Sequence, residues 1–483
     1  MKKVVLFLSV AAMVCLLVSP AWADGSDPNE LQALKDQLME LNKVVQGQQQ
    51  QIQEQGQKLQ QQEQKIQELE ETAKEQAPYA DVEAVVEKVK ADLPKPADGL
   101  TLGGGKIRVT PYGFIRLDMA YDDSATSHGA GNVLAFVWPE DGSKPVVQRN
   151  DDSTFTTTAT ATRLGLNFEG PEFVGGNIKG KVEIDFDEAA GSDSGGDVTA
   201  HRIRMRHAYA ELLYPTWSLM AGQNWDIVAP RIPNMLDCMV MWGSGNVGYR
   251  RPQVRVSKWW DVDGSKITGQ LSLNHADRKA ADDIDKDLIL DGADSSWPMG
   301  EARLGVDTVI LGERKLSLGL SGALGEEELD FPTNPGSKQH VDVWLIALDG
   351  SVTIIPNLLT LQGEIWTGED LDAFMGGVFQ GIAKETTEFT GIDSSGGFLA
   401  AALTPRKNLQ FNFGYGIDDP DDDDGLSLDN SSRSQNYTLF GNAIWTVVPN
   451  FDVGLELAWH ETKWEGQEDG DDFRIQSAVI YKF

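Results

Sequence analysis

The last eleven residues of the chain, Phe473-Arg-Ile-Gln-Ser-Ala-Val-Ile-Tyr-Lys-Phe483, alternate between two kinds of side chain. The apolar and aromatic residues share one parity: Phe473, Ile475, Val479, Tyr481 and Phe483. Arg474, Gln476 and Lys482 have the other parity. This period of two is typical of a β-strand with one apolar and one polar face. A half-buried strand of a soluble sandwich also explains the pattern, so the rest of the chain must decide.

Length and charge limit the possible classes of protein. The chain has 483 residues, with 41 Lys and Arg against 74 Asp and Glu, which gives a formal net charge of -33. A length beyond one compact domain predicts separate segments. The acidity argues against a nucleic-acid partner, because phosphates attract Lys and Arg. Cys15 and Cys238 are the only cysteines, and Cys15 lies in a segment that we expect to be cleaved, so no intramolecular disulfide is expected.

Residues 1–23 have the features of a secretory signal peptide. Lys2 and Lys3 precede an apolar run, and Ala21-Trp22-Ala23 provides a small-x-small cleavage site. Cys15 lacks the pattern of a lipoprotein signal. Beyond this segment we find no run of about 18 apolar residues that could form a spanning helix. The sequence therefore predicts an exported protein that is either soluble or a β-barrel.

Residues 24–77 are predicted to form a coiled coil. Apolar residues or Gln recur every seven residues at the two seam positions, mostly separated by Gln, Glu and Lys. From Leu31 to Gln76 such a rod would be roughly 70 Å long at about 1.5 Å per residue. One helix could not bury this seam, so oligomerisation is implied, and we interpret the Gln layers as favouring a homotrimer. A disordered Gln-rich tether is the alternative. Residues 78–105 are predicted to be a short helix and a linker.

From residue 106 to 483, segments of about ten residues alternate apolar with polar side chains. In 178–186, for example, Ile178, Val182 and Ile184 oppose Lys181 and Glu183. A charged face repeated in many strands does not suit a sandwich, whose inner faces are apolar. It suits a barrel with lipid outside and water inside.

The segments number sixteen, and their connections alternate between short and long. We place the strands at 106–121, 155–168, 176–186, 200–213, 217–226, 253–260, 266–275, 300–310, 315–325, 340–353, 358–367, 396–404, 408–417, 435–446, 451–461 and 473–483. Short turns, such as Pro356-Asn357 and Pro449-Asn450, alternate with longer connections. Membrane barrels combine short periplasmic turns with long outer loops. The fold class predicted is all-β: a 16-stranded antiparallel transmembrane β-barrel preceded by an N-terminal α-helical coiled coil.

The span 106–483 resembles the sixteen-stranded trimeric porins of Gram-negative bacteria, and most closely the DcaP-like channels with an amino-terminal coiled coil. The aromatic carboxy-terminal strand is similar to the closing strand of outer-membrane barrels. Other similar stretches are Val109-Thr-Pro-Tyr-Gly-Phe-Ile-Arg-Leu-Asp118, Thr162-Arg-Leu-Gly-Leu-Asn-Phe-Glu-Gly170, Arg206-His-Ala-Tyr-Ala-Glu-Leu212, Ala221-Gly-Gln-Asn-Trp225 and Gly454-Leu-Glu-Leu-Ala-Trp459. The resemblance implies an outer-membrane homotrimer that admits small solutes, with dicarboxylates as the implied class.

The same resemblance implies that the loop after the fifth strand, Ile227 to Pro252, folds into the barrel and narrows it. Its composition agrees, because residues such as Met235, Leu236 and Trp242 are too apolar for a solvated outer loop. Packing against a neighbouring subunit is the alternative. We expect Cys238 to be a small core residue of this loop.

Arginines are the candidate pore-lining residues. Arg202, Arg204 and Arg206 alternate with Ile203 and Met205. If Ile203 and Met205 face lipid, the three arginines face the lumen. Ala208, Ala210 and Leu212 have the arginines' parity, although apolar residues should face outward, and a β-bulge near His207 would resolve the conflict. Ion pairing with Glu183 and Asp185 is the alternative role. The full set of predicted pore-lining or constriction residues is Arg116, Arg163, Arg202, Arg204, Arg206, Asp226, Arg231, Asp237, Arg250, Arg251 and Arg255.

These residues predict a water-filled channel for passive diffusion of small hydrophilic, mainly anionic solutes. A basic wall would face acids of the inward loop, and arginine favours anions and pairs with carboxylates. The alternatives are a cation-preferring or sugar porin, or a structural envelope tether with a secondary pore. We find no catalytic motif, metal-ligand pattern or cofactor fingerprint, so we expect no enzyme, no cofactor and no metal site.

Further partners are predicted from the location. An outer-membrane barrel contacts lipid and lipopolysaccharide, and the acidic stretches Asp277 to Asp294, Asp418 to Asp429 and Glu465 to Asp472 are predicted outer loops. They could bind divalent cations that bridge lipopolysaccharide phosphates, although solvated acidic loops are the simpler interpretation. The periplasmic coiled coil could contact peptidoglycan.

Overall fold

The computed structural model describes residues 100–102, 106–126, 133–139, 153–189, 201–276, 290–330, 337–384, 388–421 and 432–483. The chain divides into two compact units, Met1–Lys95 and Pro96–Phe483. The predicted signal peptide (1–23), coiled coil (24–77) and most of the helix and linker (78–105) lie outside the described residues and stay predictions.

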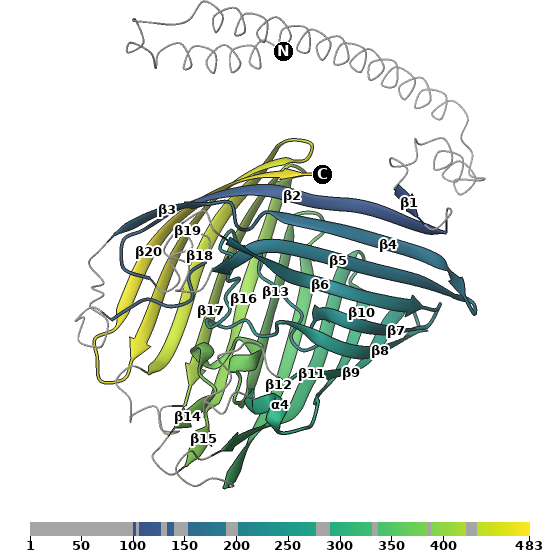
Figure 1. The fold of residues 1–483 in the computed structure, drawn as a ribbon. Helices are drawn as coiled ribbons and strands as arrows, with labels where there is room; N and C mark the ends of the chain where they lie inside the picture. The colour runs from purple at the N-terminus through teal and green to yellow at the C-terminus, as the bar shows by residue number, and fades with distance from the viewer. Residues whose placement is uncertain are drawn as a thin grey trace, which may run out of the picture. The chain divides into compact units, whose positions relative to one another are not determined.

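Sixteen antiparallel strands among the described residues form one closed barrel, as predicted (Figure 1). They are β2 (Ile107–Asp122), β4 (Arg163–Phe173), β5 (Gly176–Ala189), β6 (His201–Leu213), β7 (Trp217–Trp225), β8 (Arg250–Val262), β9 (Ser265–Asn274), β10 (Met299–Ile310), β11 (Arg314–Asp330), β12 (Lys338–Ile355), β13 (Leu359–Glu369), β16 (Asp393–Arg406), β17 (Leu409–Pro420), β18 (Arg433–Val448), β19 (Phe451–Trp464) and β20 (Gly470–Lys482). Each strand pairs with the next, and β20 pairs with β2.

Shorter elements accompany the barrel. Strand β1 (Leu100–Leu102) pairs with β2, so this part of the predicted linker is a strand. Strand β3 (Thr154–Thr158) pairs with the far end of β2 and continues the line of β4. Strands β14 (Ile382–Lys384) and β15 (Phe389–Gly391) form a separate hairpin. The helical turns are α4 (Asp291–Asp294), η1 (Asp372–Phe374) and η2 (Gly377–Phe379).

The carboxy-terminal strand closes the barrel with the predicted parity. The backbone of Phe483 exchanges two hydrogen bonds with that of Gly113, at 3.0 and 3.1 Å. Ile475 and Tyr481 are exposed on the outer face, whereas Arg474 and Gln476 are buried on the inner face. The polar side chains of this strand thus point into the barrel.

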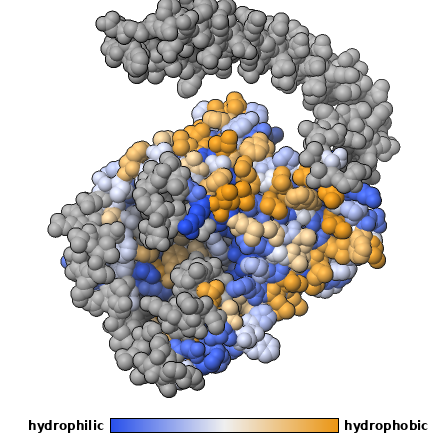
Figure 2. All heavy atoms as spheres, viewed as in Figure 1, coloured by the Kyte–Doolittle hydropathy of each residue, from blue (hydrophilic) through white to orange (hydrophobic). Residues whose placement is uncertain are grey.

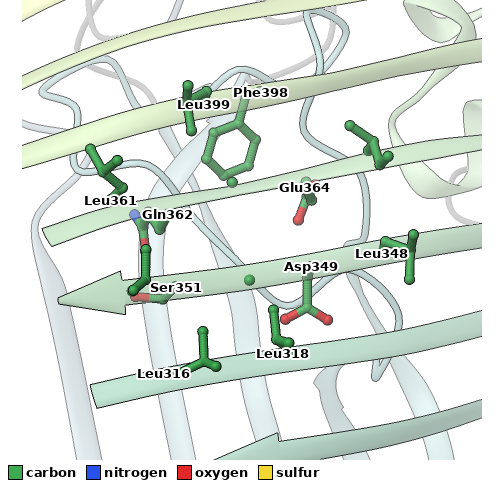
Figure 3. Close-up of a pocket in the computed structure, with 14 residues that line it drawn as sticks. Leu316, Leu318, Leu348, Asp349, Ser351, Leu361, Gln362, Glu364, Phe398 and Leu399 are labelled. Carbon is green, nitrogen blue, oxygen red and sulfur yellow. The ribbon is translucent and has the colours of Figure 1, made fainter. Parts of the chain in front are cut away.

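Leucine, valine and isoleucine cover the outside of the barrel. Figure 2 shows these apolar residues as broad orange areas over the strands. Where small residues interrupt this surface it is hollowed, as in a groove of about 450 Å³ beside Gly350 and Gly363. Figure 3 shows leucines from neighbouring strands around this groove, among them Leu318, Leu348 and Leu399. Such an apolar exterior is what a bilayer requires of a spanning barrel.

The connections alternate as predicted, and the structure adds one more short turn, between β4 and β5. Two predicted outer loops are shorter than expected. Asp418 lies within β17 and Asp472 within β20, and both are buried on the inner wall, so they are not solvated loop residues. No helix within the described ranges has the length and apolarity to cross a bilayer.

Candidate functional site

Residues 226–249, between β7 and β8, form an inward loop. Met235 and Met241 of this loop pack in one buried cluster with Phe398, Phe440 and Ala458 of the barrel wall. The predicted inward course of the loop is therefore confirmed.

Carboxylates of the wall hold the base of the inward loop. The side chain of Glu301 on β10 accepts a hydrogen bond from the backbone N–H of Ile227 at 2.9 Å. Glu364 on β13 accepts one from Val247 at 3.1 Å. A loop inside a barrel lacks strand partners for its N–H groups, and a buried N–H without a partner is costly. These wall acids meet that need.

The tip of the loop is held in the same way. Both carboxylate oxygens of Glu456 on β19 accept backbone N–H groups, from Leu236 at 2.8 Å and from Asp237 at 3.0 Å. The carbonyl oxygen of Leu236 accepts hydrogen bonds from Arg116 and from Gln476. The loop tip is therefore fixed to β19, β20 and β2.

Glycines allow the loop backbone to lie directly on the wall. Gly245 has a φ of +118°, and a Cβ atom there would lie 2.3 Å from the carbonyl oxygen of Gly397 on β16. A Cβ atom at Gly416 on β17 would lie 2.3 Å from the carbonyl oxygen of Ser244. Only glycine fits such a close approach of two backbones. Trp366 then donates its indole N–H to the carbonyl oxygen of Gly245 at 2.8 Å.

Ion pairs complete the attachment of the loop. Arg231 contacts Asp349 on β12 at 3.0 Å, and Arg303 on β10 contacts the same carboxylate at 2.7 Å. Arg251 binds both carboxylate oxygens of Asp226, at 2.9 and 3.1 Å. Residues 226–249 contain two acidic side chains, Asp226 and Asp237, and both are buried.

A second inward segment, made of residues 370–384 and 388–392, supports the first and was not predicted from the sequence. The backbone carbonyls of Phe374 and Met375 accept hydrogen bonds from Gly248 at 2.8 Å and Gly243 at 2.9 Å. Its sequence Leu371-Asp-Ala-Phe-Met-Gly-Gly-Val-Phe379 is too apolar for a solvated loop. The criterion that identified the first loop would have found this one too.

Residues 133–139 cover a further part of the wall. Thr462 accepts a hydrogen bond from the backbone N–H of Val137 at 2.9 Å, and Trp464 donates to the carbonyl oxygen of Val137 at 3.0 Å. Phe136 and Trp138 both pack against Trp464. Together the three inward segments contact the wall on β10 to β13 and on β16 to β20.

The lumen wall on β4 to β6 remains accessible to solvent. The side chains of Arg163, Lys181 and Arg204 are 30, 26 and 23% exposed. Residues at equivalent inner positions elsewhere, such as Glu301, Glu364 and Glu456, are 1 to 3% exposed. We call the inner face of β4 to β6 the basic wall, and it is the surface that a solute in the lumen would meet.

Glu183 on β5 organises one half of the basic wall. It accepts a hydrogen bond from the hydroxyl of Tyr112 at 2.6 Å and one from Arg206 at 2.8 Å. Arg163 and Lys181 lie 3.5 and 3.4 Å from its oxygens. One carboxylate thus orients three cationic groups.

Asp185 organises the other half, next to a β-bulge. Arg204 binds both of its oxygens, at 2.9 and 2.8 Å, and Arg206 binds one at 3.0 Å. The register shifts because Glu183 pairs with His207 while the next residue, Ile184, pairs with Met205, so Arg206 is the extra residue. The predicted bulge near His207 is confirmed. Ile203 and Met205 face outward, as the prediction required.

The remaining predicted site residues have different positions. Arg202 is exposed near the start of β6, and Arg255 on β8 is partly buried and donates to Gln253 at 2.9 Å. Arg116, Asp226, Asp237 and Arg251 are at most 9% exposed, so these four lie under the inward segments and not on the open lumen. A buried charge needs a partner, and the contacts that these four residues make with their partners fix the loop to the wall.

The expected acidic face opposite the arginines is therefore not formed by the loop. Burial raises the pKa of the Asp237 carboxyl to about 7, so it is partly protonated at neutral pH. The partly exposed residues at the loop tip are Cys238, Met239 and Val240, which carry no carboxylate. The basic wall faces a weakly charged loop.

Comparison with protein families gives one match for this chain. The model of the DcaP outer membrane protein family matches residues 39–278, which include strands β2 to β9 and the inward loop. The chain belongs to the DcaP family. The predicted membership of the DcaP family is thus confirmed, and this DcaP family member is an outer-membrane channel of the DcaP type. The coiled coil and the trimer stay predictions.

A solved structure with a TM-score above 0.5 has the same fold. The outer membrane channel DcaP of Acinetobacter baumannii has 20% sequence identity and a TM-score of 0.62, over 80% of this chain and 100% of that chain. An anion-selective porin from Comamonas acidovorans has 14% identity and a TM-score of 0.46, over 78% of this chain and 100% of that chain. A comparison of this chain with curated proteins gives no match.

Proposed function

We propose that this channel conducts small anionic solutes by passive diffusion, with dicarboxylates as the preferred class. The observation that supports the proposal is the asymmetry of the lumen. The accessible side carries Arg163, Lys181 and Arg204, and the carboxylates of the inward loop, Asp226 and Asp237, are buried. A solute therefore passes between a basic surface and a weakly charged one.

The mechanism needs only position and charge. Positive charge along a pore lowers the energy of an anion inside it and raises that of a cation. The guanidinium groups are held at fixed positions by Glu183 and Asp185, so they do not have to reorganise as a solute passes. Each guanidinium can bind a carboxylate through two parallel hydrogen bonds. A dicarboxylate offers two such groups, and no catalytic residue takes part.

Bilayer recordings in a KCl gradient test the proposal. We expect a reversal potential that shows chloride preferred over potassium, and a current reduced more by succinate than by an uncharged sugar of similar size. Arg204→Gln should lower the chloride preference about twofold, because it removes one exposed charge of the wall. Arg314→Gln is the matched control, since Arg314 is exposed at the β10–β11 turn. A wild-type channel that prefers potassium would refute the proposal.

The proposed assembly is a homotrimer joined by the amino-terminal coiled coil. The heptad repeat from Leu31 to Gln76 supports it, because an unpaired helix would leave the apolar seam in water. Chemical cross-linking of the full chain and of a chain lacking residues 31–76 tests this role. Loss of the cross-linked trimer on deletion is expected. A trimer that persists without the rod would instead make the rod a tether within the periplasm.

A further inference from the structure

Arg250, at the start of β8, differs from the arginines of the basic wall in its surroundings. Its guanidinium carbon lies 4.5 Å from the ring centre of Trp225, 4.5 Å from that of Tyr249 and 5.9 Å from that of Trp242. The residue is 5% exposed. Both terminal nitrogens are buried and have no hydrogen-bond partner within the described ranges. We call this arrangement the aromatic cage.

The next residue shows that this arrangement is specific. Arg251 is also buried, but it binds both oxygens of Asp226 and the backbone carbonyls of Ala276 and Ala373. Its charge is therefore compensated. The contacts of the Arg250 guanidinium are the three rings, and its terminal nitrogens have no hydrogen-bond partner within the described ranges. Cation–π contacts stabilise a cation without neutralising its charge.

The caged charge adds to the basic wall. Arg206 of the basic wall contacts the same ring as Arg250, since their guanidinium carbons lie 6.0 and 4.5 Å from the ring centre of Trp225. Arg204 and Asp185 are also within electrostatic range of Arg250. With Arg163 and Lys181 the cluster holds five cationic side chains, and among the side chains that the structure describes Glu183 and Asp185 are the carboxylates paired with them. Arg250 thus raises the net charge of this group from two to three positive charges.

We propose that Arg250 is a selectivity-determining residue that acts on permeating ions through its electric field and not by contact. The rings cover its nitrogens, so a solute cannot form hydrogen bonds with it, as it can with Arg204, whose side chain is 23% exposed. A contact site can retain a solute, whereas a covered charge favours anions without holding them. This inference rests on the proposed anion preference of the channel.

The inward loop is part of the cage, which connects its fold to selectivity. Trp225 ends β7, whereas Trp242 and Tyr249 belong to the loop. Trp242 packs against both of the other rings, at 5.9 Å from Trp225 and 5.1 Å from Tyr249. The loop segment that narrows the barrel also shields this charge from water.

The test measures the reversal potential of full-length channels in a KCl gradient. Arg250→Met should lower the chloride-to-potassium permeability ratio at least about twofold in dilute salt, and the difference should shrink near 1 M KCl, where the screening length is about 3 Å. Arg250→Lys should keep the ratio of the wild type. Succinate block should keep its dissociation rate in both variants, because Arg250 makes no contact. Arg433→Met is the control, since Arg433 on β18 is also stacked on two rings, Phe136 and Trp464, and we expect little change in the ratio.

Two outcomes overturn the inference while leaving the proposed function intact. One is an anion-preferring wild type whose ratio is unchanged in Arg250→Met, and the other is an equal loss of preference in Arg250→Met and Arg250→Lys. A second measurement needs no variant. Phenylglyoxal treatment of the folded wild type, followed by peptide mass mapping, should modify Arg204 and leave Arg250 unmodified. Modification of Arg250 at the rate of Arg204 would show that the cage is open and would refute the field role.

Discussion

The two sides of the lumen use the same residue types for different purposes. On β10 to β20, the carboxylates Glu301, Glu364 and Glu456 are covered and accept hydrogen bonds from the loop backbone. On β5, the carboxylates Glu183 and Asp185 form ion pairs with Arg163 and Arg204, which reach the accessible lumen. An inner-wall acid therefore serves either to fix a loop or to orient a cation.

The hydrogen-bond donors that lie next to each carboxylate determine which of these two roles it has. Where a loop covers the wall, the strongest nearby donors are backbone N–H groups, whose burial would otherwise be costly. Where the wall is open, side-chain cations supply the donors, and they keep part of their surface in water. The comparison teaches that the strongly negative formal charge of the chain does not predict the charge that a solute meets. Buried acids and acids in ion pairs contribute little to it.

The largest predicted effect comes from deleting Arg206, which removes the extra residue of the bulge. The deletion would shift residues 201–205 by one position and turn Arg202 and Arg204 toward lipid, while Ile203 and Met205 would face the lumen. An arginine facing lipid costs about 2 to 4 kcal/mol near the bilayer midplane. We expect no folded barrel, measured as loss of the heat-modifiable band on electrophoresis.

Arg206→Met is the matched control for this deletion. It keeps the number of residues and the bulge, and Glu183 keeps its contacts with Tyr112 and Lys181. The substituted barrel should fold. If the deleted chain folded with the same yield as the substituted one, the bulge would not set the orientation of these arginines.

The bulge shows how far the sequence could be interpreted. All sixteen strands were found from their alternation, because lipid outside and water inside impose a strict period of two on most of them. The parity conflict at Ala208 located the bulge. Strand β12 departs from this rule, because apolar residues lie on both of its faces: Val343 and Leu345 face inward and are buried, while Ile346 and Leu348 face the lipid.

The sequence could not separate the site residues that line the lumen from those that hold the loop. Arg250 and Arg251 are adjacent, yet their contacts differ. Arg251 donates to the carbonyl oxygen of Ala373, whereas Arg250 lies over the ring of Trp225, and the sequence pattern predicts neither contact. The anchors of the loop, such as Glu301 and Glu456, have the same alternation as any polar inner residue. Their role depends on which loop covers them, and alternation does not encode that.

The second prediction concerns Phe374, which joins the two inward segments on the covered side. Its ring is fully buried, and the guanidinium of Arg251 lies 4.5 Å from its centre. Phe374→Ala should lower the free energy of unfolding by about 3 to 5 kcal/mol, because truncation leaves a cavity in a packed cluster. Urea unfolding in lipid measures the loss. We also expect larger fluctuations of the single-channel current, since the inward loop loses support at Gly243 and Gly248.

Phe413→Ala provides the comparison, because Phe413 on β17 is 52% exposed on the outer wall. The same truncation there leaves no internal cavity, so the loss should be less than half as large. Equal losses for Phe374→Ala and Phe413→Ala would mean that the second inward segment adds no stability to the covered side. Current noise unchanged from the wild type would mean that it does not support the loop.

The smallest predicted effect uses Cys238, at the tip of the inward loop, to probe the accessible side. The residue is partly exposed, and its thiol lies within electrostatic range of Arg116 and Arg163. A thiol reagent that adds a sulfonate should lower the chloride-to-potassium ratio about twofold or less, and one that adds a trimethylammonium group should raise it, because each places a charge opposite the basic wall. A reagent that adds a methyl group controls for size, and Cys238→Ser should abolish every response. Shifts of the same sign from both charged reagents would show that the loop tip changes the pore by bulk alone, and the contrast between a charged wall and a weakly charged loop would then not govern selectivity.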